Sequence, residues 1–174
     1  MKRVRYQVAC SLDGFIAAPG DDMDWIPPEP SFDFVALHAQ FDTFLMGRRT
    51  YEVARAMGET FDGKRVIVAS RTLRAEDHPN VEVIGEGLEQ RIRELRQETG
   101  LDVWLYGGGS LFAQVLAWDL VDTVEPAILP VLLGSGVPLL PETAKSRRLE
   151  LRSHQVYPSG MILVEYAVIR EEGR

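Results

Sequence analysis

The chain has 174 residues, of which 45% are hydrophobic and 26% charged, and this is the composition of an ordinary soluble domain. Its formal net charge of −7 argues against a surface devoted to nucleic acid or to an anionic membrane. The single cysteine, Cys10, excludes an internal disulfide and a thiolate zinc site. We find no signal peptide and no apolar run of the ~18 residues that span a membrane. We therefore expect one cytoplasmic domain over residues 1–174, with no metal.

Short apolar strands alternate with helices over the first two thirds of the chain. Strands are expected at 4–10, 43–46, 65–69, 81–84 and 102–106. Helices are expected at 32–40, from Gly47 to about Met57, at 88–98, and directly after Gly107–Gly109. In the helix at 88–98, apolar residues recur at i, i+4 and i+7. Helices between strands imply a mostly parallel sheet that is covered on both faces.

The pattern changes in the last third. Strands are expected at 122–130, 149–157 and 161–169 with no helix between them, and residues 157–160 form a turn. This predicts an antiparallel C-terminal hairpin at the edge of a mixed α/β sheet. Residues 19–31 (PGDDMDWIPPEPS) resist regular structure and are interpreted as a functional loop.

Two strand-to-helix junctions are rich in glycine. One is Gly47-Arg48-Arg49-Thr50, and the other begins at Gly107. In open α/β sheets ligands bind beyond the carboxyl ends of the strands, and free amides at a helix start attract phosphate. Either junction alone could be ordinary turn chemistry, and neither is a GxGxxG or Walker motif. Together they favour a ligand that carries phosphate.

The arginines point in the same direction. Arg48 and Arg49 open a helix, where a cation opposes the helix dipole unless an anion is bound. Ser70-Arg71 follows the strand at 65–69 in a similar position. A solvated surface arginine explains any one of them equally well. A 2′-phosphate on adenosine would account for the cluster.

Four ordered motifs resemble the dihydrofolate reductase superfamily. They are Ser11–Ala17, Leu45–Glu52, Tyr106–Gly109, and Val121-Asp122 followed by Ile128–Gly136. The fourth is more similar to the branch that contains the C-terminal reductase domain of the bifunctional riboflavin-biosynthesis deaminase-reductases. The resemblance covers roughly residues 4–170. It implies a three-layer αβα fold whose mixed, mostly parallel sheet ends in an antiparallel C-terminal hairpin.

The resemblance also implies NADPH, lying across the carboxyl ends of the central strands. The phosphates would be held by Gly47, Arg48, Arg49 and Thr50, and the adenine ribose by Ser70 and Arg71. The pyrophosphate and nicotinamide half would lie on Gly107, Gly108, Gly109, Ser110, Leu111 and Phe112. The nicotinamide would be bordered by Ala9 and residues 12–17. A cis peptide is expected at Gly107-Gly108.

The implied activity is transfer of a hydride to a C=N or C=O carbon of a small heterocyclic substrate. The most similar known activity is 5-amino-6-(5-phosphoribosylamino)uracil reductase of riboflavin biosynthesis. Dihydrofolate reductase activity, a non-catalytic NADP(H)-binding protein and a structural dimer module remain alternatives. The histidine–glutamate pair and PCxxC motif of the riboflavin deaminases do not occur in the chain.

The candidates for proton donation are Asp13 and Asp33, with Tyr106 a weaker one. Tyr106 stands where the riboflavin reductases commonly have an acidic residue. Trp25 and Tyr106 are candidate substrate contacts, and the loop 18–31 is expected to close over the substrate. Glu125 either faces the cleft or pairs across the sheet. The three histidines show no ligand spacing and are not expected to be catalytic.

The apolar run 127–133, followed by 137–140, is longer than one sheet edge usually buries. An exposed apolar edge invites association, so we expect a homodimer through the C-terminal strands. Riboflavin-type reductases, which this branch resembles, are typically dimeric. The competing explanation is that the tail folds back over these strands within one chain.

Overall fold

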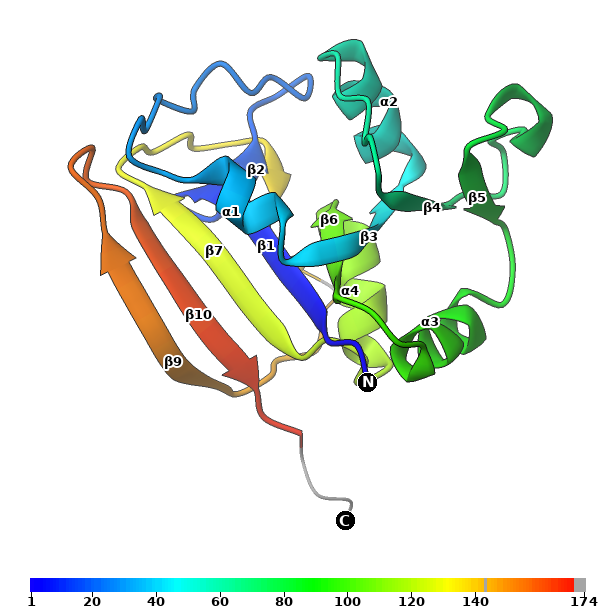
Figure 1. Cartoon of the computed structure of the whole chain (residues 1–174). Coiled ribbons are helices and arrows are strands. Elements are labelled where there is room, and N and C mark those ends of the chain that lie inside the picture. The colour runs from blue at the N-terminus through cyan, green and yellow to red at the C-terminus, as the bar shows by residue number, and fades with distance from the viewer. Residues whose placement is uncertain (143, 171–174) are drawn as a thin grey trace.

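The computed structural model describes residues 1–142 and 144–170. The strands in this part of the chain are β1 (Val4–Ser11), β2 (Phe15–Ala17), β3 (Phe41–Gly47), β4 (Arg65–Ala69), β5 (Val81–Ile84), β6 (Asp102–Gly107), β7 (Thr123–Leu129), β8 (Val137–Pro138), β9 (Leu149–Val156) and β10 (Ile162–Val168). The described residues form one sheet of eight strands in the order β5-β4-β3-β6-β1-β7-β10-β9 (Figure 1). The short strands β2 and β8 pair with each other outside it.

Helices cover both faces of the sheet. They are α1 (Phe34–His38), α2 (Arg48–Ala56), α3 (Leu88–Gln97) and α4 (Gly109–Ala117), with a 3-10 turn at Ala75–Asp77. On one face α1 and α2 pack with Phe41, Phe44 and Trp104. On the other face α3 and α4 pack against residues that include Tyr6 and Leu105. The expected three-layer αβα architecture is confirmed.

The sheet is parallel up to β7 and antiparallel beyond it. Strand β1 pairs in parallel with β6 and β7, whereas β10 pairs antiparallel with β7 and β9. The tight turn between β9 and β10 is closed by the Tyr157 amide, which donates to the Met161 carbonyl at 2.9 Å. The predicted C-terminal hairpin is therefore confirmed.

Helix α1 is shorter than expected. It begins after Asp33, whose carboxylate accepts a hydrogen bond from the Ala36 amide at 2.8 Å, and it ends at His38 rather than at residue 40. Phe41 immediately enters β3, where it is fully buried. Burial of the Phe41 side chain in the sheet requires extended backbone at this position. The helix therefore ends after little more than one turn.

The sequence analysis did not predict strands β2 and β8, because a segment of two or three residues is too short to show the alternation of apolar and polar residues that is typical of a strand. Their approach requires glycine at position 136, where φ is +146° and an added Cβ would lie 2.1 Å from the Ala17 carbonyl oxygen. The pair brings the segment after β7 back against the segment after β1. It thereby builds one rim of the region beyond the carboxyl end of β1.

The apolar run 127–133 does not form the exposed edge that its composition suggested. Strand β7 lies between β1 and β10, and its Ala127 and Leu129 are 5% and 1% exposed. The tail folds back within the same chain and covers the part of the run that lies in β7, whereas Leu132 beyond β7 is exposed. The free edge on this side is β9, all of whose residues are exposed.

The alternatives for Glu125 are resolved by an ion pair across the sheet. The Arg5 guanidinium on β1 donates to both carboxylate oxygens of Glu125 on β7, each at 2.7 Å. Both side chains are buried, and Thr123 donates a further hydrogen bond to Glu125. Glu125 therefore does not face the cleft.

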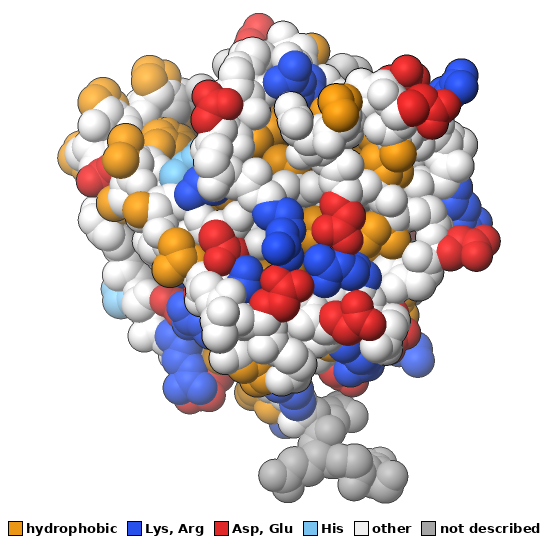
Figure 2. Space-filling view, turned by 45° about the vertical axis from the view of Figure 1, so that its right-hand side comes forward, with side chains coloured by type: hydrophobic (Ala, Val, Ile, Leu, Met, Phe, Trp, Pro, Cys, Tyr) orange, Lys and Arg blue, Asp and Glu red, His pale blue; other side chains and the backbone are white. Residues whose placement is uncertain are grey.

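On the face shown in Figure 2, acidic and basic side chains are interspersed rather than gathered by sign. A chain of ion pairs runs from Glu82 through Arg91 and Glu98 to Arg65, joining β5, α3 and β4. None of the helices in the described residues is long and apolar enough to cross a membrane.

Candidate active site

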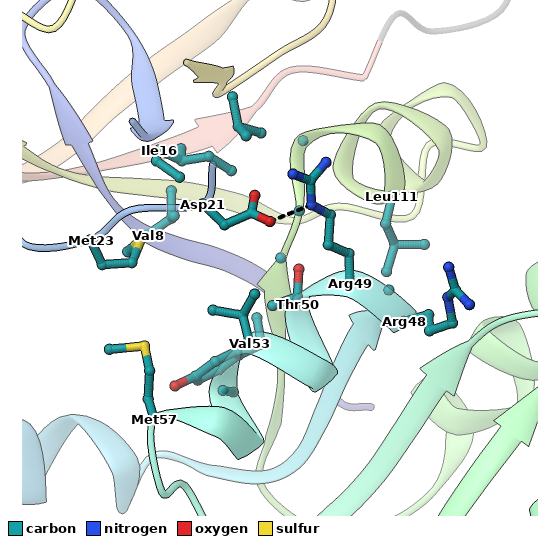
Figure 3. Close-up of a pocket in the computed structure, with 18 of the residues that line it drawn as sticks. Val8, Ile16, Asp21, Met23, Arg48, Arg49, Thr50, Val53, Met57 and Leu111 are labelled. Carbon is teal, nitrogen blue, oxygen red and sulfur yellow. Dashed lines mark hydrogen bonds and ion pairs between the residues drawn. The ribbon is translucent and has the colours of Figure 1, made fainter. Parts of the chain in front are cut away.

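A pocket of about 720 Å³ opens beyond the carboxyl ends of β1, β3 and β6 (Figure 3). Three segments enclose it: the N-terminal turn of α2, the N-terminal turn of α4, and the chain from Ile16 to Met23. Parallel strands end together at this edge of the sheet, which is where ligands bind in open α/β folds. Both glycine-rich junctions that the sequence singled out meet at this pocket.

One half of the pocket is suited to phosphate. Helices α2 and α4 begin after Gly47 and Gly108, and neither has a side-chain cap, so their first amides remain available for an anion. The backbone at Gly107 lies close to the Thr50 side chain. A Cβ added at Gly107, where φ is +144°, would lie 3.3 Å from the Thr50 methyl group. The Gly107-Gly108 peptide is cis, as expected.

The cations of this half lie at the start of α2. The Arg48 and Arg49 side chains are exposed, and the Arg49 guanidinium pairs with Asp21 from the loop that follows β2 (Figure 3). Arg48 lies 3.8 Å from Glu52, one turn further along the helix. These arginines, together with Gly47 and Thr50, line the pocket, and their role toward a phosphate stays a prediction.

The other half of the pocket is mainly apolar. Met23, Val53 and Met57 line it and lie on the side away from Arg48 (Figure 3). Val8 and Ile16 form its back wall from β1 and β2. A flat, largely apolar ring fits such walls, because thioether and branched side chains adapt to its faces.

Tyr106 is a polar group of this apolar half. Its ring stacks on Phe44 with the centroids 5.4 Å apart and packs beside Trp104. Burial, and secondarily the charge of Glu59, raises the pKa of the Tyr106 hydroxyl. The phenol therefore stays protonated at neutral pH and is able to donate a hydrogen bond into the pocket.

A second pocket, of about 630 Å³, lies beyond the carboxyl ends of β4 and β5. Ser70 and Arg71 line it together with Gln114 of α4 and Trp118, which follows that helix. The Ser70 hydroxyl oxygen accepts hydrogen bonds from the Thr72 and Leu73 amides at 3.1 and 2.9 Å. Ser70 thus shapes the turn on which Arg71 sits, and it retains a hydroxyl proton to donate.

Two expected cofactor contacts do not line either pocket. Ala9 points to the opposite face of the sheet from Val8, where it packs with Ala127 and Leu129. Phe112 is buried in the core, stacked on Tyr6 with the ring centroids 3.9 Å apart. Gly107, Gly108, Gly109, Ser110 and Leu111 do line the main pocket, and their role toward a cofactor stays a prediction.

The Asp13 carboxylate forms hydrogen bonds outside the pocket. Its carboxylate accepts hydrogen bonds from the Ser11 hydroxyl and from the Leu133 and Gly134 amides. These bonds lower its pKa to about 2, with the largest contribution from Ser11. A carboxyl group that is ionised at neutral pH is a poor proton donor. Asp13 is not among the lining residues and instead anchors the loop after β7.

Asp33 and Trp25 also lie outside the pocket lining. Asp33 caps α1 and is exposed. Trp25 packs into the apolar cluster with Leu129 and Met161, and its indole N–H is buried without a hydrogen-bond partner. The loop that carries Trp25 is held at Glu29, which accepts a hydrogen bond from the Ser159 amide at 3.0 Å. Hydrogen bonds from Ser159 and Ser31 lower the pKa of Glu29 to about 2.

Apart from Thr50, sequence reasoning missed the residues on the side of α2 that faces the pocket. Thr50, Val53, Ala54 and Met57 follow one another at i, i+3, i+4 and i+7, so the helix presents one continuous stripe to the pocket. That spacing is visible in the sequence, but of these residues only Thr50 was named as a candidate contact. Glu59 and Thr60, which follow the helix, could not have been placed without the fold.

The sheet order, the layers and the position of the pocket define a dihydrofolate reductase-like α/β domain. The family described as the RibD C-terminal domain matches residues 2–163, and the chain belongs to this family.

Among the relatives, the uncharacterized protein YyaP of Bacillus subtilis (strain 168) is 28% identical over 178 residues, covering 95% of this chain and 94% of YyaP.

Two solved structures extend the comparison. A protein from Shewanella sp. PV-4, provisionally assigned to riboflavin biosynthesis, superposes with a TM-score of 0.82 at 28% identity, covering 98% of this chain and 100% of that one. A diaminohydroxyphosphoribosylaminopyrimidine deaminase/5-amino-6-(5-phosphoribosylamino)uracil reductase from Thermotoga maritima gives a TM-score of 0.73 at 21% identity. It covers 97% of this chain but only 57% of that one, and at this identity it supports the fold alone.

Proposed function

We propose that the protein is an NADPH-dependent reductase that transfers a hydride to a C=N or C=O carbon of a small heterocyclic substrate. The observation that carries the proposal is the meeting of two uncapped helix N-termini, those of α2 and α4, across one pocket with Arg48 and Arg49. Membership of the RibD C-terminal family supports a reductase of the riboflavin-pathway type.

The residues present fit the cofactor. Amides at the start of α2 and α4 would bind the pyrophosphate, because glycines at 47, 107 and 108 leave the backbone open to it. The second pocket would take the adenosine, with Arg71 toward its 2′-phosphate. Bound NADPH supplies the hydride, and the protein orients the two rings and excludes water.

The proton that accompanies the hydride needs a source in the pocket. Tyr106 lines the pocket and its hydroxyl is protonated at neutral pH, whereas Asp13 and Asp33 are not among the lining residues. We assign to Tyr106 the donation of this proton to the substrate nitrogen or oxygen, with solvent restoring it. The reduction then balances: the substrate would gain two electrons and one proton as the hydride from the bound nucleotide, and a second proton from Tyr106.

Titration of the protein with NADPH and NADH tests the cofactor assignment. NADPH should bind more tightly, and Arg71→Ala should erode the preference, because a charge-assisted hydrogen bond is worth about 1.5–3 kcal/mol. Equal affinity for the two nucleotides in the wild-type protein would contradict it.

Oxidation of NADPH is then followed with 5-amino-6-(5-phosphoribosylamino)uracil, its dephosphorylated form, dihydrofolate and small imines. Turnover of any of these separates a reductase from a non-catalytic binding protein. Tyr106→Phe should lower kcat by about 10²-fold while NADPH affinity is retained. An unchanged kcat in Tyr106→Phe would show that Tyr106 is not the proton donor.

A further inference from the structure

The charges of the main pocket are distributed unevenly. Within the described part of the chain, the basic residues that line it are Arg48 and Arg49. Both belong to the first turn of α2. Among residues 1–142 and 144–170, no cation lines the apolar half around Met23, Val53 and Met57. Its charged group is the carboxylate of Glu59.

The two arginines are not available to that half. Arg49 is paired with Asp21, and Arg48 lies on the far side of the pocket from Met57 (Figure 3). In the proposed function both are at the phosphates of the cofactor. A phosphate on the substrate would therefore have to find another partner.

Glu59 follows α2 and is half-buried at the pocket wall. Its carboxylate accepts one hydrogen bond, from the Phe61 amide at 3.1 Å, and it forms no ion pair among the residues that the structure describes. Two nearby cations do not pair with this carboxylate. Arg55 donates to the backbone carbonyl of Glu59 at 3.2 Å, and Lys64 donates to the carbonyls of His38 and Phe41 at 2.8 and 2.7 Å.

These contacts leave a negative charge beside an apolar surface. Moving a phosphate dianion into such a site costs free energy, because it loses water without gaining a cation. The same carboxylate stabilises a ring that presents N–H donors or a positive charge. The Tyr106 ring and the walls formed by Met23 and Met57 supply the contacts for its faces.

We infer that the apolar half of this pocket takes an uncharged or protonated nitrogen heterocycle without a phosphate group, and that Glu59 sets this preference. The inference rests on the proposed reductase function and narrows its substrate class. Among compounds of the riboflavin-pathway type, the protein then selects the nucleoside rather than its 5′-phosphate.

Two probes that differ only in the phosphate test this: 5-amino-6-(ribosylamino)uracil and 5-amino-6-(5-phosphoribosylamino)uracil. Each is titrated calorimetrically into protein saturated with unreactive NADP⁺. We expect the phosphate-free compound to bind at least about tenfold more tightly. Tighter or equal binding of the phosphorylated compound overturns the inference, and so does the absence of binding by both.

Substitution of Glu59 makes the test specific. Glu59→Gln should bring the two affinities within about threefold, and Glu59→Lys should reverse their order. Asp62→Lys is the matched control, since Asp62 is exposed and outside the pocket lining, and it should keep the wild-type order. If Glu59→Lys keeps that order too, Glu59 is not the determinant. Failure of NADP⁺ itself to bind contradicts the proposed function instead, so the two failures are distinguishable.

Discussion

Arg49 at the start of α2 forms an ion pair with Asp21 in the loop after β2, and this contact joins two walls of the pocket. Asp21 adopts a left-handed backbone conformation, with φ of 64°. If Arg49 binds a cofactor phosphate, Asp21 competes for the same guanidinium and repels the same anion. Asp21→Asn should therefore strengthen NADPH binding by about threefold to tenfold.

Fluorescence titration of NADPH measures this change. Asp24→Asn is the control, because Asp24 lies on the same loop but does not line the pocket. Weaker NADPH binding by Asp21→Asn would show instead that the ion pair holds Arg49 in its binding position.

The paired glycines predict a contrast between neighbouring variants. A Cβ at Gly108 would lie 3.5 Å from the Thr50 hydroxyl, and φ of −96° suits any residue, so Gly108→Ala should fold normally. The methyl group would stand on the pocket wall, and we expect NADPH affinity to fall at least about tenfold. At Gly107, φ of +144° strains any side chain, and Gly107→Ala should lower stability as well.

Thermal unfolding and NADPH titration of both variants separate these effects. Normal NADPH binding by Gly108→Ala would place the cofactor phosphates away from this junction.

Asp13 gives a prediction of pH dependence. Its folded-state pKa of about 2 lies below the ordinary value of 3.8, so the carboxylate stabilises the fold above pH 3.8. That stabilisation is lost as the pH falls toward 2. Asp13→Ala should therefore be less stable than the wild type at neutral pH, and the difference should shrink in this acid range.

Urea denaturation at a series of pH values checks the sign of this effect. A difference that is constant from pH 7 to pH 2 would mean that Asp13 acts through packing and not through its charge.

The buried pair of Arg5 and Glu125 predicts a non-additive effect on stability. Glu125→Ala leaves a buried guanidinium without its main partner and should cost about 3–5 kcal/mol. The double variant Arg5→Met/Glu125→Leu removes both charges and should cost less than the single variant. Chemical denaturation of the variants decides between coupling and independent contributions, since additive losses would exclude coupling.

Strand β9 supports a revised form of the dimer prediction. It is the edge of the sheet, and its Leu151 and Val156 are 51% and 66% exposed. An edge strand with unpaired backbone groups and exposed apolar side chains is a template for pairing, so we propose that a second copy covers β9. Light scattering should give about twice the 19.5 kDa mass of one chain.

Leu151→Glu should shift that dimer toward monomer. Leu132→Glu should not, although Leu132 is 71% exposed and lies in the run 127–133 that the sequence first suggested as the interface. A monomeric wild-type protein would refute the dimer. If Leu132→Glu dissociates the dimer and Leu151→Glu does not, the interface lies at the run 127–133 instead of at β9.

Sequence reasoning succeeded where a local pattern decides the structure. Strands β4 and β5 were predicted with their observed bounds, because each is a short apolar run between turn residues. The two glycine-rich junctions were found because glycine directly after an apolar strand is visible in the sequence. The backbone requires it at Gly107, where φ is +144°, and at Gly109, where an added Cβ would lie 2.4 Å from the Pro138 carbonyl oxygen. Asp13 was misplaced because its partners, Leu133 and Gly134, lie 120 and 121 positions away. No local pattern reveals such a contact.

The central position of β1 has a consequence for synthesis of the chain. The neighbours of β1 in the sheet are β6, which begins at Asp102, and β7, which begins at Thr123. The first strand to leave the ribosome therefore has neither of its partners in the sheet until more than half of the chain has been synthesised. Pairing between such distant segments is slow, whereas β9 and β10 are adjacent and close quickly. In a nascent chain that stalls before residue 102, β1 stays exposed without its neighbours in the sheet. We expect chaperones to bind such a chain, because exposed apolar side chains and unpaired strand edges favour aggregation.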